Sequence, residues 1–367
     1  MPRVSGSRVD DEKMIVLSRL LLSDKQNDPA FAPMADSLRN ISREEFDELA
    51  ALADTNHVIV RGMEVFRQIA LDSHDAERAA WADAAIAAEH GRIAKAVDFL
   101  RTICSAFAEE HLDVTVIKSL DHWPDLGSDL DLYTNADPEI VCAMMQRRFK
   151  AEIAARSWGD RLAGKWNFSI PGLAESVEIH MCRLGQTGEQ LVLASKLPGR
   201  SREIQIERQT FRVPSASDRL MISTLQRMYR HFYFRLCDIV DSASLAGSGA
   251  VDFEDLQSSA QAAGIWEGVA TYLTIVSDYV KQYRGVDLDL PQPVKDGARF
   301  GGELVYFGRD FLRVPIMPQS AALYRTQLAG LLRKRELESS ARLGLLPWLA
   351  TAAAVGQKIT GSDKGIW

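Results

Sequence analysis

The stretch Gly127-Ser128-Asp129-Leu130-Asp131-Leu132 sets two carboxylates one residue apart in an apolar alternation. In an extended strand, residues two positions apart point to the same side, so the two aspartates share one face and the leucines share the other. Two like charges held this close are unfavourable unless a cation lies between them. The stretch therefore predicts a strand, and it predicts a metal site only if another carboxylate joins it.

That further carboxylate is Glu178, in the alternation Val177-Glu178-Ile179-His180-Met181. Glu178 and His180 share one face of the expected strand, and the apolar residues share the other. If the two strands are neighbours, three carboxylates converge at one edge of a sheet. Such oxygens, with substrate phosphates, suit Mg²⁺, and paired ions can activate an attacking oxygen and stabilise a leaving one. The pattern therefore indicates phosphoryl or nucleotidyl transfer.

An isolated Asp-x-Asp is more often a solvated strand face than a metal site. With the second strand, which carries Glu178 and His180, the two interpretations have equal weight. The sequence argues against a calcium-binding EF-hand, because the glycine and the distal glutamate of that loop are missing after Asp129.

Composition restricts the class of protein. The 367 residues include 43 basic and 50 acidic side chains, a net charge of −7, and 46% are hydrophobic. This is ordinary for a soluble globular chain of two or three domains, and it argues against a protein that coats DNA through a general basic surface. The cysteines are scattered and are expected to be reduced thiols rather than a disulfide framework or zinc site. They are Cys104, Cys142, Cys182 and Cys237.

Neither end of the chain indicates a membrane or secretory segment. The run Leu345 to Val355 is apolar but has 11 residues and contains Pro347, whereas a spanning helix needs about 20 residues. The polar N-terminus does not resemble a secretory signal. We therefore expect a cytoplasmic protein without a membrane span.

The expected fold class is α+β, with a small mixed β-sheet core flanked by N- and C-terminal helical regions. Residues 1–111 form the N-terminal helical region, a bundle of four to six helices in which Ser42 and Glu45 resemble a capping box. Residues 112–214 form the core, and residues 215–367 form the C-terminal helical region. In the core we expect strands at 114–117, 129–132, 165–170, 176–182 and 205–213 and a helix over 138–155. Breaks between the C-terminal helices are expected near 247–250, 285–293 and 314–318.

Three separated motifs together resemble a known family. They are Val116-Ile117-Lys118, Ser128-Asp129-Leu130-Asp131-Leu132 and Val177-Glu178-Ile179-His180. In this order they resemble the uncharacterised nucleotidyltransferase family of the DNA polymerase β-like nucleotidyltransferase superfamily. The order of elements is similar from about residue 14 to residue 280, and the motif identity is confined to residues 116–180.

The resemblance implies a role for each matching residue. Asp129 and Asp131 become metal ligands, and Glu178 becomes the third carboxylate, which can bind metal and help to deprotonate the acceptor. His180 is expected to orient Glu178 or contact substrate rather than bind Mg²⁺, because imidazole favours softer metals.

The resemblance also implies contacts with the nucleotide. Lys118 would reach a phosphate, and Ser128 would offer its hydroxyl or backbone N–H to the triphosphate. The family has a glycine after the lysine, where this chain has Ser119, and a helix with an arginine-bearing loop before the Asp-x-Asp strand. Here the link from Ser119 to Gly127 is too short for that helix, so Gly127-Ser128 itself would replace the phosphate turn. Within the link, Asp121 and His122 either stabilise a turn or contact substrate.

A basic segment in the C-terminal region completes the expected site. Arg227, His231 and Arg235 are spaced i, i+4 and i+8 in a predicted helix running to Asp238, so they share a face. Related proteins similarly carry a His/Arg-bearing helix as a wall of the active-site cleft. A row of cations facing the carboxylates would bind a triphosphate, and a solvated basic face is the equally weighted alternative.

These features predict a Mg²⁺-dependent nucleotidyltransferase, with Mn²⁺ as a possible substitute. It would move a nucleoside monophosphate from an NTP, expected to be ATP, to an unidentified acceptor and release pyrophosphate. Two alternatives stay open: a non-catalytic nucleotide-binding or scaffold protein of the same fold, and a toxin-like enzyme modifying tRNA or protein. The sequence does not identify the acceptor, the base or the oligomeric state.

Overall fold

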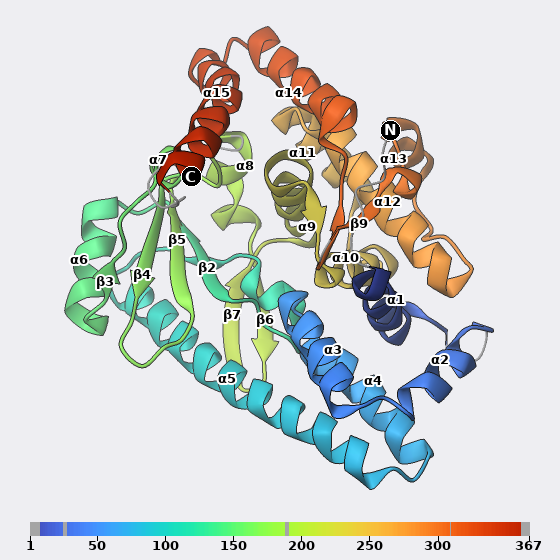
Figure 1. Ribbon diagram of the computed structural model, residues 1–367. Helices are drawn as coiled ribbons and strands as arrows, with labels where there is room; N and C mark the ends of the chain where they lie inside the picture. Colours follow the sequence, from blue (N-terminus) through green and yellow to red (C-terminus); the bar gives the residue numbers. More distant parts are fainter. Residues whose placement is uncertain (1–7, 25–27, 188–190, 309, 361–367) are drawn as a thin grey trace.

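The computed structural model describes residues 8–24, 28–187, 191–308 and 310–360. The chain runs through a helical region, a small sheet and a second helical region, which confirms the expected α+β class (Figure 1).

The first region is a set of helices that ends in one long helix beneath the sheet (Figure 1). The helices are α1 (Arg8–Leu22), α2 (Phe31–Leu38), α3 (Arg43–Thr55), α4 (Ile59–Asp72) and α5 (Ala76–Glu109). Ser42 and Glu45 form the expected capping box at the start of α3, in which each side chain accepts the other residue's backbone N–H. The expectation of four to six helices before the sheet is confirmed in the described residues.

The central sheet has the order β1-β2-β5-β4-β3. Its strands are β1 (Thr115–Val116), β2 (Asp129–Thr134), β3 (Glu152–Ile153), β4 (Lys165–Ser169) and β5 (Ser176–Met181). Strands β2 and β5 are parallel neighbours, and the other pairs are antiparallel. The sheet is therefore mixed, as expected, and its central pair carries the two acidic motifs.

The alternation in the sequence separates two hydrophobic cores on the two faces of the sheet. Leu130, Leu132 and Ile179 are buried in a core that they share with α5 and α6 (Pro138–Phe149). Tyr133, on the face of the aspartates, is buried in a second core that contains the N- and C-terminal helices. The acidic face thus looks toward the helical regions rather than toward open solvent.

Two expected elements in the core differ from the structure. The helix expected over 138–155 ends at Phe149, because Lys150 takes a left-handed conformation with φ of 51° and the chain then forms edge strand β3. The single strand expected over 205–213 is a hairpin of β6 (Arg202–Ile206) and β7 (Gln209–Val213), which reverses at Glu207 with φ of 53° and forms its own two-stranded sheet.

Helix α8 (Leu191–Lys196) lies at the end of the core. The C-terminal region that follows contains the helices α9 (Ala216–Thr224), α10 (Leu236–Gly247), α11 (Phe253–Ala263), α12 (Trp266–Arg284), α13 (Gln292–Gly297), α14 (Ala321–Arg333) and α15 (Leu337–Thr360). The breaks expected near 247–250 and 285–293 are confirmed by the ends of α10 and α12. The sequence did not predict the three-stranded sheet of β8 (Tyr233–Phe234), β9 (Tyr306–Gly308) and β10 (Phe311–Arg313), whose strands are too short for a periodicity signal. Its last strand ends beside the third expected break, near 314–318.

The remaining short helix, α7 (Trp158–Leu162), precedes β4. Across the described residues, every helix is too short or too polar to pass through a bilayer.

Candidate active site

The three carboxylates of the sequence motifs meet at one end of the β2–β5 pair. Asp131 lies directly opposite Glu178 in the parallel register, and Asp129 lies opposite Ser176. Oxygen and nitrogen atoms of Asp131, Glu178 and His180 lie within 4.8 Å of one another. Asp129 lines the same cleft as Asp131 and Glu178. Parallel pairing of two alternating strands therefore produces the convergence that the motifs predicted.

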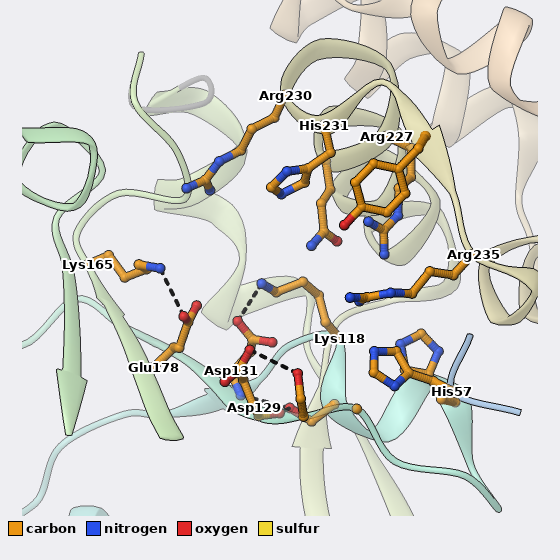
Figure 2. Close-up of a pocket in the computed structure, with 16 residues that line it drawn as sticks. His57, Lys118, Asp129, Asp131, Lys165, Glu178, Arg227, Arg230, His231 and Arg235 are labelled. Atoms are coloured by element: carbon orange, nitrogen blue, oxygen red, sulfur yellow. Dashed lines mark hydrogen bonds and ion pairs between the residues drawn. The ribbon is translucent and has the colours of Figure 1, made fainter. Parts of the chain in front are cut away.

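Two lysines occupy this acidic cluster. Lys118 forms an ion pair with Asp131, and Lys165 Nζ lies 2.9 Å from Glu178 Oε1 and 3.2 Å from Asp160 Oδ1 (Figure 2). Lys165 comes from β4, which pairs with β5 on the side away from β2. The lysines neutralise part of the negative charge that the three carboxylates would otherwise concentrate at one point.

Burial and the neighbouring charges shift the pKa values of the three carboxylates in different directions. Burial, with the charge of Glu178, raises the pKa of Asp131 to about 7 against the opposing effect of Lys118. Burial and Glu178 also raise the pKa of Asp129. The pKa of Glu178 is lowered, because Lys118 and Lys165 outweigh its burial. Glu178 is therefore the carboxylate that the site keeps most firmly ionised.

His180 lies beneath the acidic cluster rather than on the cleft surface. Its side chain is 2% exposed, and its Nε2 is 3.9 Å from Asp131 Oδ1. Neither ring nitrogen has a hydrogen-bond partner within the described residues. Burial, together with the charge of Lys118, lowers the pKa of His180 well below its usual value, so the ring is neutral. The ring makes no hydrogen bond to Glu178 within the described residues, and the expectation that His180 orients Glu178 or contacts substrate stays a prediction.

The opposite wall of the cleft is basic. Figure 2 shows Arg230, His231, Arg227 and Arg235 across from the carboxylates, with Lys118 between the two groups. Arg230 is exposed, and neither it nor Arg235 has an ion-pair partner among the residues that the structure describes. Two arginines are thus available to an anionic ligand.

The basic wall does not arise from one helix face, so that expectation is wrong. A π-helical segment, Leu225–His231, ends at Phe232 in the left-handed conformation, and β8 separates it from Arg235, the N-cap of α10. Asp238 brings the two ends together: its Oδ2 lies 2.7 Å from Arg227 Nε in an ion pair, and it accepts the Arg235 backbone N–H at 2.7 Å. The same residues line the cleft through this turn rather than through helical spacing.

The short link before β2 is held by arginines of both helical regions. Arg61 of α4 donates to Asp125 Oδ2 at 2.6 Å, and Asp125 Oδ1 accepts the Val60 backbone N–H at 2.6 Å. Arg219 of α9 pairs with Asp121 at 2.6 Å. These ion pairs hold the link as a 3₁₀ turn over Ser119–His122.

Arg92 of α5 supports Gly127, where the link enters β2. Its guanidinium donates to the carbonyl oxygens of Leu126 and Gly127 at 2.9 and 3.2 Å and pairs with Glu175 at 2.5 Å. Gly127 and the exposed Ser128 line the mouth of the cleft, and Ser128 Oγ donates to Asp129 Oδ2 at 3.4 Å.

His122 joins the cleft to α10. Its Nδ1 lies 2.6 Å from Asp241 Oδ2, and its Nε2 lies 3.9 Å from Cys237 Sγ. Burial opposes protonation, but Cys237 and Asp241 raise the pKa of His122 well above its ordinary value. Asp121, by contrast, is committed to Arg219 and stabilises the turn.

All the candidate residues except His180 line one cleft, with several that sequence reasoning missed. The missed residues are His57, Ser119, Lys165, Gln226, Arg230 and Tyr233. Lys165 opens the strand that the sequence did predict, and its alternation with Asn167 placed it on the acidic face. His57 carried no local signal, because it reaches the cleft from the turn between α3 and α4.

The donor set fits a divalent cation. Three carboxylates in one cleft supply the oxygen ligands that Mg²⁺ prefers, and the orphaned His180 nitrogens lie within reach of the same oxygens. The basic wall opposite supplies donors for phosphate oxygens.

No family model and no curated protein matches this chain. Among solved structures, the chain is similar to an antigenic nucleotidyltransferase-like protein from Paracoccidioides brasiliensis. The identity is 12%, the match covers 52% of this chain and 93% of that one, and the TM-score is 0.33.

Proposed function

We propose that this protein is a metal-dependent nucleotidyltransferase. It would move a nucleoside monophosphate from an NTP, with ATP as the expected donor, to an acceptor and release pyrophosphate. The observation that carries the proposal is the convergence of Asp129, Asp131 and Glu178 opposite Arg230 and Arg235 in one cleft. Carboxylates that hold a cation and arginines that hold phosphates are the two halves of such a site.

The two walls of the cleft would have different roles. Asp129, Asp131 and Glu178 would hold Mg²⁺, with Mn²⁺ as a substitute, and the bound cation would neutralise charge developing on the phosphate oxygens. Arg230 and Arg235 would bind the triphosphate from the other side, because they face the carboxylates and neither has an ion-pair partner among the described residues.

Lys118 lies between the two walls and pairs with Asp131. Its ammonium would turn from the carboxylate to a phosphate when a cation takes its place, since both compete for the same oxygen. Glu178 would also accept the proton of the attacking hydroxyl. Gly127 and Ser128 would contact the phosphates at the mouth of the cleft, with His231 and Arg227 on the opposite wall.

One observation favours a second candidate, a nucleotide-binding protein without turnover. Lys118 and Lys165 already pair with Asp131 and Glu178, so the carboxylates are balanced by the chain's own cations. In that case the basic wall would bind a nucleotide without transfer of the nucleotidyl group.

The test uses each of the four NTPs radiolabelled at the α-phosphate, with Mg²⁺ or Mn²⁺ and cell-extract acceptors. We expect pyrophosphate release and transfer of label, with both falling at least about a hundredfold in Asp129→Asn and Asp131→Asn, since cation contacts supply several kcal/mol to the transition state. Asp98→Asn, at an exposed pair with Arg101 on α5, is the matched control and should keep full activity.

Nucleotide binding measured by calorimetry separates the candidates. Binding with no pyrophosphate release under any condition would favour the second candidate. Transfer that survives in the double variant Asp129→Asn/Asp131→Asn would contradict the metal-dependent assignment.

A further inference from the structure

His180 is a buried polar side chain whose partner is missing from the described residues. It is 2% exposed, and neither Nδ1 nor Nε2 has a hydrogen-bond partner. Leaving a buried polar group unsatisfied costs about 1–3 kcal/mol, so such a group in a folded protein calls for an explanation. The ring stands on the acidic face of β5, in register with Tyr133 of β2 and Lys165 of β4.

The position of the ring leaves few possible partners. His180 is 2% exposed and is not among the described residues that line the cleft, so almost none of its surface is open to a substrate there. Its nearest charged oxygen, Asp131 Oδ1, is 3.9 Å away, too far for a hydrogen bond. A metal ion between His180 Nε2 and Asp131 Oδ1 would be a partner for both atoms.

The distances suit a shared ion. Ligands that each lie about 2.0–2.3 Å from one metal are at most about 4.5 Å apart. The His180–Asp131 separation of 3.9 Å is within that limit, and Glu178 offers an oxygen within 4.8 Å of both. The His180 nitrogen and the Asp131 oxygen are therefore close enough to share one ion, and a Glu178 oxygen lies beside them.

We propose that His180 is a metal ligand with Asp131 and Glu178, and that this position consequently takes Mn²⁺ or Co²⁺ in preference to Mg²⁺. Imidazole is a poor partner for Mg²⁺, whereas its affinity for first-row transition metals rises along the series that begins with Mn²⁺. The inference rests on the proposed function only in placing a divalent ion at Asp131 and Glu178.

The ammonium of Lys118 lies beside the position proposed for the metal ion. Its ammonium pairs with the Asp131 carboxylate, and Asp131 Oδ1 is also the oxygen nearest to His180. Metal binding would displace this ammonium toward the basic wall (Figure 2).

Pulsed electron paramagnetic resonance with Mn²⁺ alone, without nucleotide, tests the proposal directly. We expect a hyperfine coupling from an imidazole nitrogen in the wild-type protein, and a changed coupling when the protein is labelled with heavy-nitrogen histidine. The labelled wild type needs no substitution, so the test stands even if a variant fails to fold.

Variants then assign the nitrogen. In His180→Asn the coupling should vanish, and Mn²⁺ affinity should fall by about 10–100-fold, at least as much as the loss of a hydrogen-bond partner of a metal ligand costs. His231→Gln, which removes another imidazole of the same cleft, is the matched control and should keep the coupling. Competition with Mg²⁺ should show a preference for Mn²⁺ that narrows in His180→Asn.

The outcomes separate this inference from the proposed function. Mn²⁺ binding that is lost in Asp131→Asn but shows no histidine nitrogen overturns the role of His180 and leaves the carboxylate site standing. Mn²⁺ binding unaffected by Asp131→Asn and Glu178→Gln overturns both.

Discussion

Ser119 holds the acidic strand at the point where the family resemblance calls for glycine. Its hydroxyl accepts the Asp131 backbone N–H at 2.7 Å and is buried. The preceding residue, Lys118, has φ of 62° and ψ of −54°, and the Ser119 N–H bonds to the Ile117 carbonyl at 2.6 Å, which closes a tight γ-turn. This turn aims Lys118 at Asp131, and Ser119 fixes the turn to β2.

At the residue scale, Ser119→Ala should destabilise the protein by about 1–3 kcal/mol, because the buried Asp131 N–H loses its acceptor. Urea unfolding followed by circular dichroism measures the change. The exposed Ser128→Ala, on the same segment, should change stability by less than about 0.5 kcal/mol. Equal effects of the two substitutions would contradict the anchoring role of Ser119.

At the scale of elements, α4 and α10 are joined to the link before β2 through one guanidinium. Arg61 pairs with Asp125 and with Asp241, each at 2.6 Å, and Asp125 is completely buried. Asp241 in turn binds His122. The position of the shortened link is therefore set by helices from both ends of the chain.

Arg61→Met should cost about 3–5 kcal/mol, since it leaves buried carboxylates without their cation. Arg67→Met, on the same helix but in an exposed pair with Asp83, should cost less than about 1 kcal/mol. Denaturant unfolding of both variants measures the contrast. Adding Asp125→Asn to Arg61→Met should recover part of the loss, and strict additivity of the two would show that the pair is not coupled.

At the scale of the whole molecule, charged side chains from all three regions of the chain act on His57 in the cleft. Burial, followed by the charges of Arg235, His122, Arg227 and Arg92, lowers the pKa of His57 to about 2. The ring also stacks on His122, with the ring centres 5.8 Å apart. The pKa of His57 therefore depends on the packing of the helical regions against the core.

The pH dependence of stability follows from that shift. Below about pH 6.5 the unfolded chain binds a proton at His57 and the folded protein does not, so folding loses about 1.4 kcal/mol per pH unit from this group as pH falls. In His57→Gln this contribution disappears. The slope of unfolding free energy against pH, measured between about pH 4.5 and 5.5, should be smaller by about 1.4 kcal/mol per unit. An unchanged slope would mean that His57 is protonated in the folded protein.

The acidic face of the sheet could be predicted from the amino-acid sequence alone. Period-two alternation in Asp129–Leu132 and Val177–Met181 requires the carboxylates on one side of each strand and the apolar residues on the other, because a strand's geometry is local. The same locality explains why the Ser42 capping box was predictable. It also explains the error over Arg227 to Asp238, where local spacing predicted one helix and the chain instead reverses at Phe232.

The residues that surround the acidic face are brought there by contacts between distant segments of the chain. Lys165 enters the acidic cluster because β4 pairs with β5, and Arg61 reaches Asp125 across 64 positions of sequence. The isolation of His180 could not be predicted from alternation either, since it depends on which side chains pack over the ring. Contacts between distant segments set charge balance and burial, and these decide which carboxylate stays ionised and which nitrogen is left for a ligand.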